Sequence, residues 1–123
     1  MTEVEDLVKD AEDMISKAIK EMEVDIRDAA EKAWAATVRA TDALVLAKTG
    51  FKPKVMSERR MKLGELILKE PRIDEARIWD RFHSRSDVLY SSCFYEGICE
   101  PKELLKKKII ETKDYIEDVK KFI

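Results

Sequence analysis

The sequence predicts an all-α protein: a single domain over residues 1–123, folded as an antiparallel up-and-down bundle of about five helices. Three observations support this fold class. Apolar residues recur at steps of three and four over most of the chain, as they do along one face of a helix. No useful stretch alternates apolar and polar residues, so we expect no strands. The 3 Gly and 3 Pro among 123 residues are too few for the many turns of an all-β protein.

The first helix is expected over residues 3–22, where apolar side chains form one stripe. Thr2 precedes this helix, and Glu5 follows three residues later. This spacing predicts a capping box, in which each side chain accepts a hydrogen bond from the backbone of the other residue.

The second helix is expected over residues 26–48, with Asp25 as N-cap and Gly50 near the C-cap. Its alanines cover more than one side of the helix, which allows neighbouring helices to approach closely. They are Ala29, Ala30, Ala33, Ala36, Ala40 and Ala43. We therefore expect this helix at the centre of the bundle, with Trp34 in the core. Its charges gather on one strip: Asp28, Lys32, Arg39 and Asp42.

Residues 51–55 are interpreted as a loop. Ser57 is then expected to cap a short third helix that extends to about Lys69 and ends before Pro71.

Asp74 is expected to cap a fourth helix, and Gly97 to close it. Pro101 suits the first turn of a fifth helix that runs to Phe122. The connections between all these helices are short, which favours antiparallel neighbours in the bundle.

The predicted fourth helix carries most of the residues with chemical potential. At 100° per residue, one arc is apolar and holds Ile78, Trp79, Phe82, Leu89, Tyr90 and Cys93. Arg77, Arg81 and Arg85 recur every four residues as one cationic ridge near the other side. Guanidinium groups in such a row suit phosphate or the RNA backbone. The alternative, favoured because acidic residues are interleaved, is a solvated face neutralised by Asp74, Asp80 and Asp87.

His83 is the only histidine and lies on the flank of the apolar arc. It is a candidate general acid or base, although a packed and hydrogen-bonded histidine is the favoured interpretation. Cys93 is expected in the core, and Cys99 is the better candidate for a reactive thiol. One His and two Cys at this spacing do not make a metal site, and no glycine-rich phosphate loop or complete catalytic motif is present. We therefore predict no metal and no cofactor.

Composition narrows the function classes and the location. The net charge of −2 offers no bulk electrostatic reason for non-specific nucleic-acid binding. The acidic N-terminus does not resemble a signal peptide, and the longest charge-free run, Val88–Tyr95, is far too short to span a membrane. We expect a cytoplasmic protein with no membrane partner. The chain lacks Asn and Gln and is 41% charged, as in proteins from hot environments.

Two segments resemble a known family. DIRDAAEKAWAATVRATDALVLAKTG, residues 25–50, resembles the signature helix of the archaeal PaREP family, and LYSSCFYEG, residues 89–97, resembles its later aromatic and Tyr-Glu motif. That family is grouped with HEPN domains, α-helical bundles that often dimerise and include ribonucleases and toxin–antitoxin components. The resemblance implies a HEPN-like bundle and a homodimer.

Active HEPN proteins carry an Arg followed about five residues later by His, and two such sites meet at the dimer interface. Arg85 matches the Arg by position, but Ser91 occupies the position of the His. Since a serine hydroxyl does not shuttle protons near pH 7 as imidazole does, the first hypothesis is a non-enzymatic, dimeric binding or regulatory module of the toxin–antitoxin kind. More apolar surface than the helices need for their own packing also favours a two-fold interface.

Two alternatives stay open. The first is a HEPN-type ribonuclease or nucleotide-handling enzyme that uses Arg85, His83, Tyr95 and Glu96, with Ser91 beside them. The second is an RNA-binding module that uses the Arg77, Arg81 and Arg85 ridge. Basic residues of the segment before it would assist: Lys52, Lys54, Arg59, Arg60 and Lys62.

Overall fold

The computed structural model describes residues 2–123, and all the regular structure in this part of the chain is helical. The elements are α1 (Glu3–Glu21), α2 (Ile26–Thr49), α3 (Met56–Lys69), α4 (Pro71–Glu75), α5 (Ile78–Arg85), the π-helix η1 (Ser86–Tyr95), α6 (Lys102–Ile110) and α7 (Thr112–Lys120). The all-α prediction is confirmed. The first two predicted helices are present. The predicted start of the third helix is wrong, and the regions predicted as the fourth and fifth helices are each divided into shorter helices.

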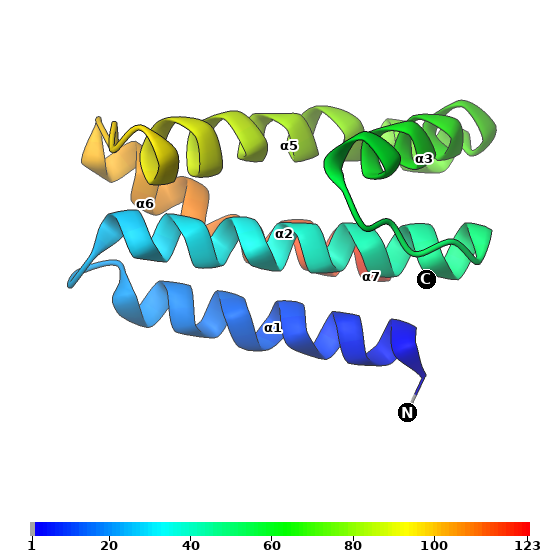
Figure 1. The fold of residues 1–123 in the computed structure, drawn as a ribbon, viewed down its shortest axis with the longest axis horizontal. Helices are drawn as coiled ribbons and strands as arrows, with labels where there is room; N and C mark the ends of the chain where they lie inside the picture. The colour runs from blue at the N-terminus through cyan, green and yellow to red at the C-terminus, as the bar shows by residue number, and fades with distance from the viewer. Residues whose placement is uncertain (1) are drawn as a thin grey trace.

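The helices form an up-and-down bundle (Figure 1). α1 and α2 run antiparallel, α5 and η1 continue one another as a third rod that runs back along α2, and α6 with α7 forms the returning fourth rod. The short α3 and α4 sit at the end of the bundle where α2 finishes. This arrangement brings α5 and the α6–α7 rod against the same side of α2, where the candidate site lies.

α2 is the central helix, as its alanines predict. It contacts α1, α3, α5, η1, α6 and α7. The six alanines are essentially without solvent exposure. Because a methyl group takes little space, helices on several sides pack close to the α2 backbone, and Trp34 supplies bulk against Phe82 and Tyr90.

The caps of the first two helices are confirmed. The Thr2 hydroxyl accepts a hydrogen bond from the Glu5 amide (3.1 Å), and the Glu5 carboxylate accepts one from the Thr2 amide (3.2 Å). Asp25 accepts from the Asp28 amide (3.1 Å). Gly50 lies in the left-handed region (φ 76°) and its amide donates to the Leu46 carbonyl, which closes α2.

The predicted N-cap of the third helix is wrong by two positions. α3 begins at Met56 with Val55 as N-cap, and Ser57 lies inside the first turn. The Glu58 carboxylate accepts from the Lys54 amide (2.9 Å) and fixes the entering chain instead. Pro71 does follow the end of α3, and it is also the first residue of α4, where a missing N–H costs nothing.

The predicted fourth helix is divided into three parts. Asp74 lies within α4 and does not cap α5. The N-cap of α5 is Arg77, whose backbone lies in the left-handed region (φ 59°). This conformation costs a residue with a side chain about 1–2 kcal/mol. From Ser86 onward the chain is a π-helix with i→i+5 hydrogen bonds. Each residue there turns less than the 100° of an α-helix, so a wheel drawn for an α-helix fails beyond Arg85.

The predicted fifth helix is interrupted at Glu111, which separates α6 from α7. The Lys108 carbonyl, which a continuous helix would pair with the Thr112 amide, accepts from the Arg85 guanidinium (2.8 Å) and from the Thr112 hydroxyl (3.4 Å). Side chains from the core therefore take over the backbone acceptor at the point where the helix breaks.

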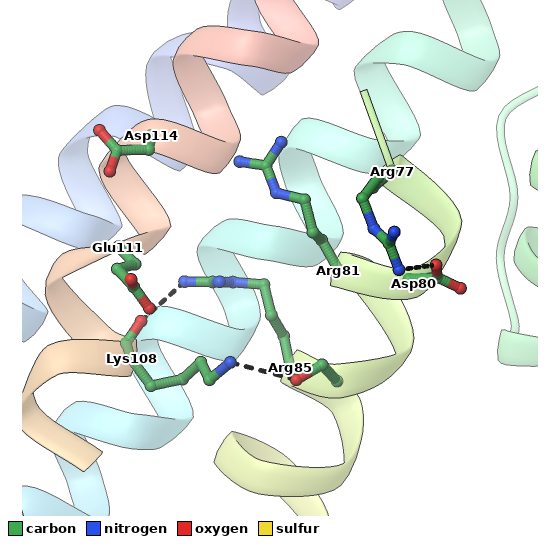
Figure 2. A pocket seen from close by; sticks show the side chains of 8 residues that line it. Arg77, Asp80, Arg81, Arg85, Lys108, Glu111 and Asp114 are labelled. Atoms are coloured by element: carbon green, nitrogen blue, oxygen red, sulfur yellow. Dashed lines mark hydrogen bonds and ion pairs between the residues drawn. The ribbon is translucent and has the colours of Figure 1, made fainter. Parts of the chain in front are cut away.

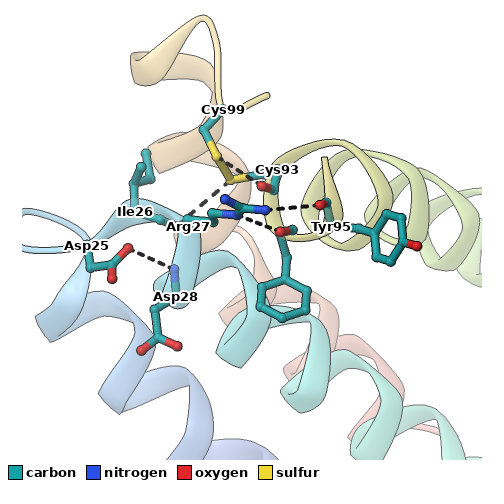
Figure 3. Close-up of a disulfide and its surroundings, with 8 residues drawn as sticks. Asp25, Ile26, Arg27, Asp28, Cys93, Tyr95 and Cys99 are labelled. Carbon is teal, nitrogen blue, oxygen red and sulfur yellow. Dashed lines mark hydrogen bonds between the residues drawn. A yellow bond between two sulfur atoms is a disulfide. The ribbon is translucent and has the colours of Figure 1, made fainter. Parts of the chain in front are cut away.

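Cys99 is not a free thiol, which overturns the prediction of a reactive cysteine. It forms a disulfide with Cys93, whose Cα atom lies 4.4 Å away (Figure 3). Cys93 is fully buried, as predicted. Beside the disulfide, Arg27 donates to the carbonyls of Phe94 (2.6 Å) and Tyr95 (3.0 Å), so its cation caps the C-terminal end of η1.

Asp42, one of the residues on the charged strip of α2, does not face water. It is buried in a two-point ion pair with Arg59, with nitrogen–oxygen distances of 2.6 and 2.9 Å. Arg59 is therefore unavailable to an RNA ligand, and the basic group proposed from sequence loses that member. None of the helices in the described part of the chain combines the length and the apolar content that crossing a membrane requires.

We expect Trp34→Ala to lower the free energy of unfolding by about 3–5 kcal/mol, because a buried aromatic leaves a cavity that the helices fill only in part. Chemical denaturation measures this. Tyr95→Ala is the control: its ring is 70% exposed, so the change should stay within about 0.5 kcal/mol. A loss below about 1 kcal/mol for Trp34→Ala would contradict its place in the core.

Candidate functional site

A hollow of about 350 Å³ opens between α5 and the α6–α7 rod (Figure 2). Charged side chains dominate its lining, which consists of Arg77, Asp80, Arg81, Ser84, Arg85, Lys108, Glu111 and Asp114. Its size lies at the lower end of the range for ligand pockets, about 300–1,000 Å³. The three arginines of the predicted ridge therefore line one concave site and do not form an open row.

Arg85 forms the floor of the hollow and is only 3% exposed. Its Nε donates to the Thr37 hydroxyl (3.2 Å), and its Nη2 donates to the Lys108 carbonyl (2.8 Å) and to the Thr112 hydroxyl. All these acceptors are neutral, and no carboxylate of residues 2–123 lies within 4.0 Å of the guanidinium. Burial away from water lowers the pKa of Arg85 to about 10. The side chain is still a cation at pH 7.

The third nitrogen of this guanidinium, Nη1, donates to no residue in the described part of the chain. That part also contains no fully buried side-chain nitrogen or oxygen without a partner. Nη1 must therefore be reachable from solvent, and the hollow that Arg85 lines is where it is reached. Figure 2 shows the guanidinium extending across the site toward Lys108 and Glu111.

Tyr115 supports the arginines from inside the bundle. Its hydroxyl pairs with the Thr41 hydroxyl (2.7 Å), and the centre of its ring lies 5.4 Å from the Arg81 guanidinium and 5.6 Å from that of Arg85. Both cations thus face the ring within the range of cation–π attraction. Burial raises the pKa of Tyr115 to about 12, so the phenol is neutral at pH 7.

The other two arginines of the site already have carboxylate partners. Arg81 donates to the Ala76 carbonyl (3.1 Å) and pairs with Asp118 (2.9 Å). Arg77, at the mouth, pairs with Asp80 (2.6 Å) and is largely exposed. Burial raises the pKa of Asp118, hydrogen bonds from Arg81 and Lys121 lower it, and the net result is a decrease. Asp118 is thus held as an anion beside Arg81.

Lys108 completes the cationic side of the hollow, and its Nζ donates to the Ser84 hydroxyl (3.1 Å). Glu111 and Asp114 stand on the same rod as Lys108, one turn apart. The lining therefore has buried or half-buried donors at its floor and carboxylates nearer its mouth, where Asp80 and Asp114 are exposed.

The structure does not assemble the site that the sequence placed around Arg85. Ser91, Tyr95 and Glu96 do not line the hollow. They belong to the far part of η1 and the turn after it, where the Glu96 amide donates to the Ser91 carbonyl (3.1 Å). Because the π-helix turns less per residue, Glu96 does not return to the side of Arg85, and no Arg85–Glu96 ion pair forms among the described residues.

His83 is packed and hydrogen-bonded, the arrangement that the sequence favours. Its ring lies 4.2 Å from that of Trp79, its Nδ1 is 2.9 Å from the Trp79 carbonyl oxygen, and its Nε2 accepts from Arg60 (3.1 Å). Since the Arg60 N–H must donate, Nε2 is the acceptor of this bond, and Nδ1 is left to donate to the Trp79 carbonyl. Neither His83 nor Arg60 lines the hollow.

Several residues of the site carry no local sequence signal. Thr37 interrupts an alanine-rich face, Thr112 lies within an apolar stripe, and Ser84 and Lys108 read as ordinary surface positions. They meet Arg85 only because α2, α5 and the α6–α7 rod pack together. The available sequence signal for the site was the ridge of Arg77, Arg81 and Arg85 at four-residue spacing.

No protein-family model, curated protein or solved structure matches this chain.

Membership in the PaREP family or the HEPN superfamily thus stays a prediction.

Within residues 2–123, no three His, Cys, Asp or Glu side chains are grouped so that they could hold a metal ion.

Tyr115 should titrate late in an absorbance titration of the folded protein, with a pKa of about 12. The raised pKa stabilises the fold fully below about pH 10, the value for an unfolded tyrosine. This contribution is lost as the pH rises from about 10 to about 12. Tyr115→Phe should remove the late step and leave the titration of the other two tyrosines. A Tyr115→Phe difference that appears near pH 10 and not near pH 12 would contradict the buried Tyr115.

Proposed function

We propose that this protein is a non-enzymatic binding module that holds a phosphate-bearing ligand, RNA or a nucleotide, in the hollow lined by Arg77, Arg81 and Arg85. The supporting observation is Arg85: a buried cation of the hollow with neutral hydrogen-bond acceptors, no carboxylate within 4.0 Å, and one nitrogen, Nη1, that donates to no residue of the described chain. A buried charge without a counterion costs several kcal/mol. A bound anion would supply that counterion.

The chemistry of the lining supports phosphate over a carboxylate ligand. Arginine offers planar, paired donors that suit phosphate oxygens, and lysine adds a point charge. Arg81, Arg85 and Lys108 provide such donors from two walls of one hollow. Arg77, near the mouth, uses one of its five N–H groups on Asp80, and the other four are available to a ligand that enters.

Binding without cleavage is the form of the proposal that the site supports. Ribonuclease chemistry of the HEPN kind requires an imidazole near the Arg, and the only histidine lies outside the hollow with both ring nitrogens engaged. We expect a mixed RNA pool to stay intact with the purified protein.

We expect single-stranded RNA to bind with an affinity that falls steeply as salt rises, because phosphate contacts release counterions. Arg77→Ala should weaken binding and reduce the slope of log K against log salt by about 0.7, the value for one phosphate contact on a single strand. Fluorescence anisotropy at several salt concentrations measures both quantities.

Arg72→Ala is the matched control for this experiment. Arg72 is also an exposed arginine, five residues away, but it does not line the hollow. It should leave affinity and slope unchanged. Equal effects of the two substitutions, or no binding at low salt, would contradict the proposed function.

A homodimer is the second part of the proposal, and the surface of α3 supports it. Met61, Gly64 and Leu68 follow one another at helical spacing, and Trp79 lies against Gly64. Met61 and Leu68 are exposed, Leu68 by 88%. Gly64 makes room for the Trp79 ring, and the exposed apolar side chains beside it suit contact with the same surface of a second copy across a two-fold axis.

Sedimentation velocity should show a dimer at micromolar concentration, and Leu68→Glu should convert it to a monomer because the carboxylate cannot be buried unpaired. Val24→Glu is the control, since Val24 is 85% exposed in the turn between α1 and α2. It should leave the dimer intact. A wild-type monomer would refute this part without affecting ligand binding.

A cytoplasmic location in a heat-adapted archaeal cell belongs to the same proposal. The chain has no Asn or Gln, which fits thermal adaptation. The Cys93–Cys99 disulfide agrees with it, since intracellular proteins of hyperthermophiles form disulfides that cytosolic proteins of other cells rarely keep.

A further inference from the structure

We infer that the hollow recognises a terminal phosphate monoester, on a free nucleotide or at the end of an RNA strand, and not the phosphodiester backbone. This rests on the proposed phosphate-binding function and specifies its ligand. Three features of the hollow support it: the number of free donors at its floor, the carboxylates at its mouth, and the charge left unpaired inside it.

The floor offers several donors to one small group. Arg85 has Nη1 free, as described above. Lys108 uses one of its three N–H groups on Ser84 (3.1 Å), and the Ser84 hydroxyl, which accepts that bond, keeps its own hydrogen to donate. These donors come from both walls of the hollow. A monoester presents three terminal oxygens, whereas a diester within a strand presents two, so the donor set suits the monoester better.

The mouth excludes a strand that runs through the site. Asp80 and Asp114 are exposed there, and Glu111, which is half-buried, adds a third carboxylate to the lining. A continuous backbone carries a phosphate on each side of the one that is bound. These neighbours would approach carboxylates, and like charges repel more strongly in the reduced dielectric of a partly enclosed site. A terminal phosphate has a neighbour on one side at most.

The unpaired charge inside the hollow matches a dianion. Arg77 and Arg81 are paired with Asp80 and Asp118. Arg85 and Lys108 are the two lining cations of the described chain without a carboxylate within 4.0 Å, and Glu111 and Asp114 of the same lining act on Arg85 from farther away. A phosphate monoester approaches two negative charges above its second pKa of about 6, whereas a diester carries one. The monoester therefore offers a close counterion to each of the two cations.

The test compares RNA 10-mers of one sequence with an internal fluorophore and a phosphate at the 5′ end, at the 3′ end or at neither. Anisotropy gives their dissociation constants at pH 7.5, and calorimetry compares adenosine monophosphate with adenosine. We expect a phosphate at one of the ends, or on the free nucleoside, to tighten binding by about tenfold or more, as charge-assisted hydrogen bonds do. The two arms distinguish a strand end from a free nucleotide.

Lys108→Met keeps the aliphatic stem of the side chain and removes its charge, and it should reduce this preference to less than about threefold. Lys107→Met is the matched control: Lys107 is the adjacent residue on α6, is exposed and does not line the hollow. It should keep the full preference. Circular dichroism and thermal melting establish that both variants are folded.

Equal affinities with and without a terminal phosphate would overturn this inference and leave the proposed function standing. A preference that survives in Lys108→Met would place phosphate recognition outside the hollow, and so would overturn it too. Absence of binding by every RNA and by adenosine monophosphate would overturn both the inference and the proposed function.

Discussion

Arg85 connects four helices through one buried side chain. From the end of α5 it donates to Thr37 on α2, to the Lys108 carbonyl on α6 and to Thr112 on α7. Each charge-assisted hydrogen bond is worth about 1.5–3 kcal/mol, and burying the charge costs several kcal/mol. The free energy gained from these hydrogen bonds is therefore similar in size to the cost of burying the charge, and the network contributes little net stability. Its main consequence is geometric, because it sets where α6 ends, how α7 lies against α5, and where the hollow opens.

The surroundings of Arg85 explain why it can remain a cation inside the bundle. The alanines of α2 let α5 and α7 come close, and the Thr37 hydroxyl stands among them as a neutral acceptor. Tyr115 places the face of its ring beside two guanidinium groups. Neutral oxygens and a ring face stabilise the charge without cancelling it, which leaves the positive field available to a ligand that enters the hollow.

The parts of the fold governed by short-range rules could be predicted. The capping box of Thr2 and Glu5, the Asp25 cap and the left-handed Gly50 depend on residues within one turn of each other. The later helices could not be predicted in the same way. The π-helix, the break at Glu111 and the left-handed Arg77 depend on which distant groups take the backbone hydrogen bonds. The sequence did identify Arg85 as a candidate. Its predicted neighbours, in η1 and the turn after it, do not lie beside it, because an α-helical wheel does not describe η1.

The sequence by itself determined that this protein is helical, that the alanine-rich segment is its central helix, and that Arg77, Arg81 and Arg85 are its notable cations. Periodicity and side-chain size are enough for these statements, because they act along one helix at a time. Only the tertiary structure decided that Arg85 is buried, that Asp42 and Arg59 neutralise each other, and that Lys108 and Ser84 join the arginines. These relations join residues 17 to 48 positions apart, and the packing of whole helices sets such distances.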